Sequence, residues 1–194
     1  QFPWRRDIYS QILNNLNQHN PSAIAFDIIF SEKDRLNPQN LLQQLQKESD
    51  QFINVEVQNT NQIFIDTVKQ SKVILPIIGE PKDNFVVNNS KPKLRIISKG
   101  NDPKSFIYKF KNKIISLEEI NNAATGIGSI SLLPNIDGII RRVPVLYNID
   151  NQIWPSLALE TVRVSTNQKN LLVQTNSGGI EFIKTRANVI PSDQ

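Results

Sequence analysis

Residues 23–30 read AIAFDIIF, and this nearly continuous apolar run decides the fold class. A run of this length beside a helix is typical of a strand that is covered on both faces. The neighbouring helix is predicted over residues 6–19, where apolar side chains recur on one face at helical spacing: Ile8, Ile12, Leu13 and Leu16. Pro21 ends that helix, because the residue before a proline is biased away from helical backbone. The first thirty residues therefore predict a helix followed by a buried strand.

The same alternation continues to about residue 80. Asn37 and Pro38 begin a second predicted helix, another helix runs to about residue 70, and residues 72–78 form a second apolar strand. Strands that alternate with helices favour a parallel sheet. The sequence thus predicts an α/β fold with a central mixed, largely parallel sheet flanked by helices.

Shorter elements are predicted in the second half of the chain. They are a strand with one aromatic face at 106–111, a helix opened by Ser116 that ends at Gly126, a strand at 139–147 and a helix at 155–164. The residues between the last two, 148–152, have the composition of a hairpin turn. Residues 171–173 and 180–183 flank a Ser-Gly-Gly turn and predict a C-terminal β-hairpin.

The composition excludes several kinds of site. The 194 residues contain no Cys, so disulfides, thiolate metal sites and cysteine nucleophiles are impossible. The single His, His19, lies at the end of a predicted helix and has no Ser-His-Asp context around it. The glycine-containing string at 126–131 precedes a strand, whereas a dinucleotide site needs it to open a helix. We therefore expect no catalytic residues, no metal and no cofactor.

The net charge of +4 is unevenly distributed. Residues 82–113 hold nine Lys and Arg and two Asp, so the rest of the chain is net negative. A basic stretch alone is a weak signal for nucleic acid, and a lysine-rich loop and edge strand produce the same pattern. We interpret the stretch as solvated surface and expect no nucleic-acid partner.

Asp27 is the carboxylate of most interest, because it lies at the end of the predicted strand, where open α/β sheets place their ligands. With Glu32 close behind, it is a candidate for a ligand or cation site. The alternative is a carboxylate that pairs with an arginine. Arg141 and Arg142 are the obvious partners: on a strand they point to opposite faces, so that one holds Asp27 or Asp137 and the other meets solvent. An anion-binding arginine pair is the other possibility.

Three short segments in a fixed order carry a resemblance. They are FPWRR at 2–6, which leads through the first helix to AIAFDIIFSE at 23–32, then DGIIRRVP at 137–144, and PSLALE at 155–160. Together they resemble the CHASE2 family of extracytoplasmic sensory domains over about residues 2–165. Trp4, Arg6 and Ser156 belong to these segments, and most of the motif residues are expected to be structural. Arg5 departs from the family's usual Trp-Pro-Arg.

The resemblance implies that residues 1–194 are a single sensor domain excised from a longer bacterial membrane receptor. Such a domain is extracytoplasmic, here periplasmic, and is flanked by transmembrane helices of an inner-membrane protein. It is noncatalytic, binds an unidentified small molecule or protein, and signals to a cytoplasmic histidine kinase, nucleotide cyclase or Ser/Thr kinase. A homodimer of this chain is one expected assembly.

Two alternatives remain at this point. One is a metal-assisted α/β hydrolase-like enzyme that uses Asp27 with Glu32 or Asp34 as the base. The other is a purely structural dimerisation module. The candidate residues for ligand binding or for the structural motif are Asp27, Glu32, Asp137, Arg141, Arg142, Trp4, Arg6 and Ser156.

Overall fold

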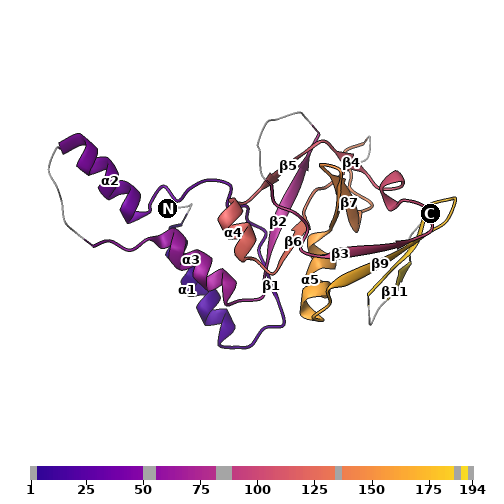
Figure 1. Ribbon diagram of the computed structural model, residues 1–194, viewed down its shortest axis with the longest axis horizontal. Coiled ribbons are helices and arrows are strands. Elements are labelled where there is room, and N and C mark those ends of the chain that lie inside the picture. Colours follow the sequence, from indigo (N-terminus) through magenta and orange to yellow (C-terminus); the bar gives the residue numbers. More distant parts are fainter. Residues whose placement is uncertain (1–3, 50–55, 82–88, 134–136, 186–188, 192–194) are drawn as a thin grey trace.

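The computed structural model describes residues 4–49, 56–81, 89–133, 137–185 and 189–191, and it is a mixed α/β structure (Figure 1). The described helices are α1 (Arg6–Asn17), α2 (Pro38–Ser49), α3 (Thr60–Lys69), α4 (Glu118–Ala123) and α5 (Leu157–Ser165), with a 3-10 turn at Pro103–Ser105. The described strands are β1 (Ile24–Ala25), β2 (Val73–Glu80), β3 (Arg95–Lys99), β4 (Lys109–Phe110), β5 (Asn112–Ile115), β6 (Gly126–Ser129), β7 (Leu146–Ile149), β8 (Gln152–Pro155), β9 (Asn170–Thr175), β10 (Ile180–Lys184) and β11 (Val189–Pro191).

The first sheet is built around β2. This strand pairs in parallel with β1 and β6 and antiparallel with β5. Its first five residues are fully buried, because neighbouring strands and helices leave neither face to solvent. The prediction of a mixed, largely parallel sheet flanked by helices is therefore confirmed.

Two smaller sheets complete the structure. One has the order β11-β10-β9-β3, in which β9 and β10 form the predicted C-terminal hairpin and β3 adds in parallel to β9. The other has the order β4-β7-β8. The turn between β7 and β8 has Asp150 and Asn151 at φ 53° and 56°, the left-handed backbone of a two-residue hairpin turn, as the sequence predicts. The molecule is elongated, with α2 at one end and β11 at the other (Figure 1).

The run at 23–30 forms less strand than predicted. Only Ile24 and Ala25 pair with β2 as a strand. From Ile77 onward β2 pairs with β5 and no longer with residues of this run. The following residues continue without a ladder, and Phe30 is fixed by a hydrogen bond from its N–H to the Ser116 hydroxyl. The prediction that both faces of this strand are covered is wrong, since Ala25 and Asp27 are exposed.

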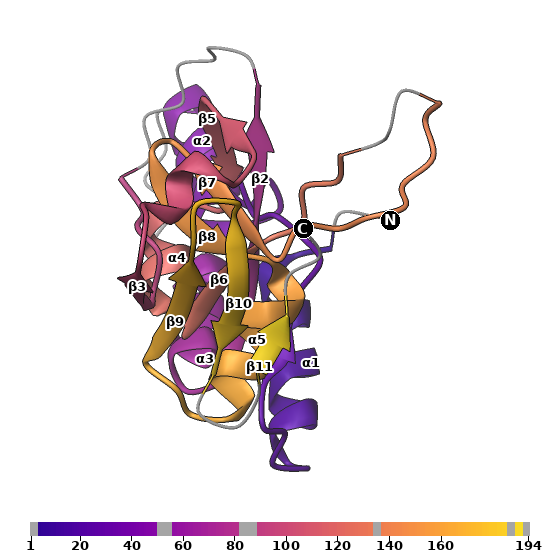
Figure 2. The same cartoon turned by 90° about the vertical axis from the view of Figure 1, so that its right-hand side faces the viewer.

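Three other predictions are corrected in the second half. A 3-10 helix at Pro103–Ser105 precedes residues 106–108, which are irregular. Of the strand predicted at 106–111, only Lys109 and Phe110 form a strand. Residues 139–145 are irregular and lie on an arm that projects from the body (Figure 2). Ser116 does not cap the next helix, because its hydroxyl accepts the bond from Phe30. Residues 2–3 of the first motif, 82–88 of the basic stretch and 192–194 lie outside the described residues.

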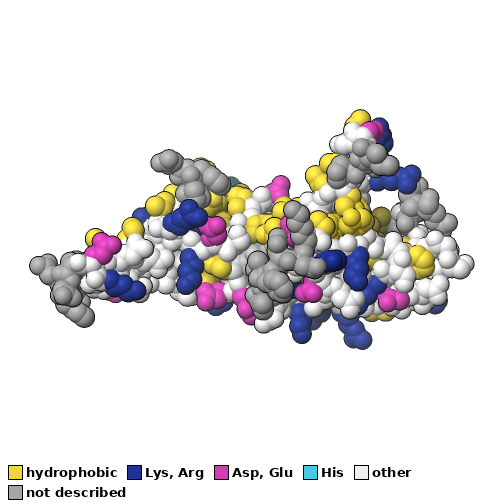
Figure 3. All heavy atoms as spheres, turned by 90° about the horizontal axis from the view of Figure 1, so that it is seen from above, with side chains coloured by type: hydrophobic (Ala, Val, Ile, Leu, Met, Phe, Trp, Pro, Cys, Tyr) yellow, Lys and Arg dark blue, Asp and Glu magenta, His cyan; other side chains and the backbone are white. Residues whose placement is uncertain are grey.

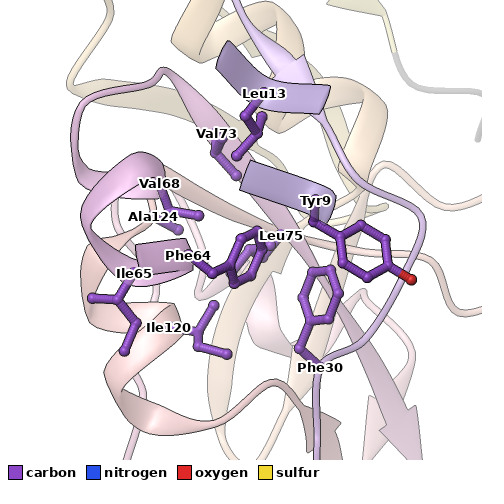
Figure 4. Close-up of a cluster of buried hydrophobic side chains, with 10 residues drawn as sticks. All are labelled: Tyr9, Leu13, Phe30, Phe64, Ile65, Val68, Val73, Leu75, Ile120 and Ala124. Atoms are coloured by element: carbon purple, nitrogen blue, oxygen red, sulfur yellow. The ribbon is translucent and has the colours of Figure 1, made fainter. Parts of the chain in front are cut away.

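The buried face of α1 shares only Leu13 with the predicted apolar face. Arg6, Tyr9, Ser10 and Leu13 are buried, while Ile8, Ile12 and Leu16 remain 36–43 % exposed. The inner face packs on α3 in the first core cluster, where side chains of α1, α3, α4 and β2 meet (Figure 4). Tyr9 and Leu13 thus face the core, and the row of Ile8, Ile12 and Leu16 is left outside.

The glycines at 126–131 serve packing. They lie in β6, a buried strand that the sequence did not predict. A Cβ at Gly128 would lie 2.6 Å from the Leu157 Cα, and one at Gly126 would lie 2.6 Å from Glu160 Oε1. Only glycine lets α5 approach the sheet this closely, which explains the pattern without a nucleotide.

Candidate ligand-binding site

Trp4, Arg6 and Glu32 come together at a pocket of about 340 Å³. The pocket lies between the first turn of α1 and the segment at 28–35 that follows the first strand. Its lining combines aromatic and aliphatic side chains with charged ones: Trp4, Arg6, Tyr9, Ile28, Ile29, Phe30, Ser31, Glu32, Lys33, Asp34 and Arg35. A volume of this size is within the range of small-molecule sites.

Arg6 is the buried cation of this pocket, with 8 % of the residue exposed. Its guanidinium lies over the Phe30 ring, 4.3 Å from the centroid, and its Nη2 donates to the Glu32 carbonyl oxygen at 2.9 Å. Burial lowers the pKa of the guanidinium. Nε is buried without a partner among the described residues. The site therefore holds a desolvated positive charge with unused hydrogen-bonding capacity.

Asp34 anchors the first turn of α1. One of its oxygens accepts from the Arg6 backbone N–H at 3.0 Å and from the Thr60 hydroxyl at 2.8 Å, and the other accepts from the Leu36 N–H at 3.0 Å. A carboxylate at a helix N-terminus also complements the helix dipole. Because both oxygens are engaged, Asp34 is a positioning carboxylate for Arg6 and a poor candidate for the base of a hydrolase.

The walls of the pocket are aromatic. The Tyr9 ring centroid lies 5.9 Å from that of Trp4 and 5.2 Å from that of Phe30. Figure 4 shows Tyr9 and Phe30 packed together at the edge of the core. Trp4 is 46 % exposed, so it forms the outer wall, whereas the buried Phe30 forms the floor. Trp4 is therefore the ring that a ligand here would contact directly, beside the Arg6 cation, because Tyr9 and Phe30 are only 3 % and 1 % exposed.

Glu32 contributes its backbone more than its carboxylate. The carboxylate pairs with Arg35 at 2.6 Å, with both side chains more than two thirds exposed. Arg5, the residue that departs from the family pattern, makes a similar pair with Asp7 at 2.6 Å and holds the pKa of that carboxyl below its ordinary value. Each of these pairs is neutral within itself, which leaves Arg6 and Asp34 as the buried charges that line the pocket.

Asp27 lies apart from this pocket. It is exposed and is not among the lining residues, and it has neither an arginine partner nor a convergent carboxylate in the described part of the chain. No group of three or more His, Cys, Asp or Glu side chains in that part is placed to hold a metal ion. The convergence of Asp27 with Glu32 and Asp34, which the hydrolase alternative needs, is absent from residues 4–49.

Asp137 and Arg141 form an ion pair on the projecting arm. Arg141 Nη2 lies 2.7 Å from Asp137 Oδ2, and the Arg141 hydrogen bond lowers the pKa of Asp137. The argument that two adjacent arginines face opposite sides of a strand does not apply, because this segment is irregular. Arg142 instead lines a second pocket of about 460 Å³, together with Tyr108 and Pro191. The two arginines therefore do not form a common anion site.

Ser156 caps a helix. Its hydroxyl oxygen accepts from the Leu159 N–H at 3.1 Å at the start of α5, a structural role as expected for a serine at this position. The sequence reasoning missed a buried ion pair on the same helix, between Glu160 and Arg163. Their separation of three residues on a helix was the available signal.

Basic and acidic side chains are intermixed on the face of the molecule that Figure 3 shows. On the face in Figure 3, Lys and Arg side chains are spread along the molecule with Asp and Glu between them. Lys113, which ends the basic stretch, is buried and pairs with Asp150 at 3.1 Å. The basic stretch thus contributes partly to internal structure.

Comparison with known proteins places the chain in one family. The family model described as the CHASE2 domain matches residues 1–194. No curated protein and no solved structure matches the chain. In the described residues, no helix is both long enough and apolar enough to cross a membrane.

Proposed function

Because the chain belongs to the CHASE2 family of extracytoplasmic sensory domains, we propose that it is the ligand-sensing part of a bacterial transmembrane receptor. The domain is periplasmic in this proposal, held at the inner membrane by flanking helices, and noncatalytic. It signals to a cytoplasmic histidine kinase, nucleotide cyclase or Ser/Thr kinase. The observation that carries the proposal is the pocket at the first turn of α1, which combines aromatic walls with a buried cation.

The position of the pocket supports a signalling role. Arg6 lines the pocket and is also the first residue of α1, and its backbone N–H is held by Asp34. A ligand that contacts Arg6 therefore acts on the start of a helix that packs along α3. Binding would favour one position of α1 over another, which is the population shift a receptor needs. The signal then leaves through the chain that precedes α1.

The placement outside the cytoplasm is tested by topology fusions to the natural gene. Alkaline phosphatase joined after Gln194 is expected to be active, because that enzyme needs disulfides that form only outside the cytoplasm. A β-galactosidase fusion at the same residue is the matched control and is expected to be inactive. The reverse pattern of activities would disprove the proposal, whatever the ligand is.

A second candidate function, a dimerisation module, is favoured by the outer face of α1. Ile8, Ile12 and Leu16 follow one another at four-residue spacing and are 37 %, 36 % and 43 % exposed. An exposed apolar row is typical of a contact with a partner. The partner in this proposal is a second copy of the chain, whose identical row would complete a two-fold interface.

Sedimentation velocity of the isolated domain at increasing concentration tests this interface. The unaltered domain is expected to form dimers, and Ile12→Glu is expected to make it monomeric, since a charge would be buried in the contact. Asn14→Glu is the control, because Asn14 is exposed on the same helix and far around it from Ile12. A domain that stays monomeric at all concentrations would exclude the dimer.

A further inference from the structure

We infer that the pocket at the first turn of α1 binds a small organic carboxylate with an apolar or aromatic body, and that the Arg6 guanidinium receives the carboxylate. The inference rests on the proposed sensory function and names the chemical class of the ligand.

The first step is the incomplete bonding of Arg6. Only Nη2 of the three guanidinium nitrogens donates to a described residue, and that acceptor is a neutral carbonyl. Within the described residues no carboxylate lies within ion-pair distance of Arg6, although the residue is nine-tenths buried, and the Asp34 carboxylate acts on the guanidinium only from a longer distance. Buried charges in proteins are normally paired, since desolvation is costly. A ligand carboxylate would supply the missing partner through the planar fork of donors that arginine presents.

The second step is the charge of the remaining lining. Glu32 is paired with Arg35, and Asp34 accepts three hydrogen bonds from the protein. Neither carboxylate is therefore free to bind a cationic ligand. Lys33 lines the same pocket, is exposed, and makes no ion pair with the described residues. Arg6 and Lys33 together favour a ligand with negative charge.

The third step is the shape of the pocket. Trp4 is 46 % exposed and provides a ring face beside Arg6, whereas Tyr9 and Phe30 are almost fully buried, and Ile28 and Ile29 add aliphatic surface. Inorganic phosphate or sulfate would contact the cation and leave this apolar surface unused. A volume of about 340 Å³ suits a ring with a short acidic side chain. The combination therefore favours an arylacetate or a similar acid over a simple anion.

Isothermal titration calorimetry of the domain with paired compounds tests the inference. Phenylacetate and indole-3-acetate are compared with the matching neutral amides, phenylacetamide and indole-3-acetamide, and with acetate. At least one acid is expected to bind at least about tenfold more tightly than its amide, because only the acid makes charge-assisted hydrogen bonds to Arg6. Acetate is expected to bind much more weakly than that acid, because it does not reach the rings.

Two variants place the binding at Arg6. Arg6→Gln is expected to remove the preference for acid over amide, while Arg5→Gln preserves it, since Arg5 lies outside the pocket and pairs with Asp7. The acid–amide comparison on the unaltered domain needs no variant, so it stands even where Arg6→Gln fails to fold.

Each other outcome overturns the inference. Equal affinity for acid and amide would show that the pocket does not select negative charge. Equal affinity for acetate would show that the rings do not contribute, and an unchanged preference in Arg6→Gln would place the site elsewhere. If no acid in the panel binds, the ligand class is wrong, whereas the sensory function is judged separately by the topology fusions.

Discussion

Glu160→Gln is expected to destabilise the domain by about 3–5 kcal/mol, because it leaves the Arg163 guanidinium buried without a counter-charge. Glu160 is fully buried and Arg163 is 5 % exposed. Arg163 donates from Nη2 and Nε to the two carboxylate oxygens at 2.6 and 2.7 Å, and its Nη1 donates to the Gln168 carbonyl. The carboxylate also packs against β6, where Gly126 leaves room for it. The pair thus fixes α5 to the first sheet.

Urea denaturation measures the free energy of unfolding of Glu160→Gln, of one control variant and of one double variant. Glu32→Gln is the matched control, because Glu32 also pairs with an arginine three residues away but both side chains are exposed, and it is expected to cost less than about 1 kcal/mol. Glu160→Leu combined with Arg163→Leu is expected to recover much of the loss, since no charge then remains buried. Equal costs for Glu160→Gln and Glu32→Gln would contradict the argument.

The elements predicted correctly are those whose pattern is local. The helices at α1, α2, α3 and α5 each carry helical spacing or a proline at the start, and β2 is a long apolar run with turn residues after it. The turn between β7 and β8 was predictable because its residues tolerate left-handed backbone, although the strand β8 itself was not predicted. In these cases the residues that decide the structure are adjacent in sequence.

The predictions failed where the deciding partner is distant in sequence. The run at 23–30 looks like a full strand, but its length is limited by β5, some eighty residues later, which takes the second half of β2. Residues 139–145 have strand composition but no ladder partner among the described residues, so they remain irregular on the arm. A single sequence does not reveal which strand pairs with which.

The candidate site was predictable only in part for the same reason. Trp4 and Arg6 were selected by the family resemblance, and Glu32 by its closeness to Asp27. The pocket itself depends on contacts between residues 26–28 positions apart, such as Arg6 with Glu32 and with Asp34. Asp27, the most obvious carboxylate in the sequence, lies outside it because β1 ends at an exposed edge.

Phe64→Ala is expected to cost about 3–5 kcal/mol, the range for deleting a buried aromatic ring. Phe64 has no exposed surface, and its ring centroid lies 4.9 Å from that of Phe30 and 6.1 Å from that of Tyr9. The surrounding side chains come from α1, α4 and β2, which are held by separate contacts and cannot all close the cavity (Figure 4). The loss therefore includes both the transfer of the ring from water and the unfilled volume.

Leu45→Ala is the control for the same measurement, because Leu45 lies on α2 with 54 % of its surface exposed and is expected to cost less than about 1 kcal/mol. Phe64→Leu fills most of the space and is expected to lie between the two. Phe64 packs against Phe30, and Phe30 lies beneath the Arg6 guanidinium. The Phe64→Leu variant therefore also changes the packing beneath the pocket. An equal loss of unfolding free energy in Phe64→Ala and Leu45→Ala, measured by thermal or urea unfolding, would mean that α3 does not pack as described. The packing beneath Phe30, the floor of the pocket, would then also be wrong.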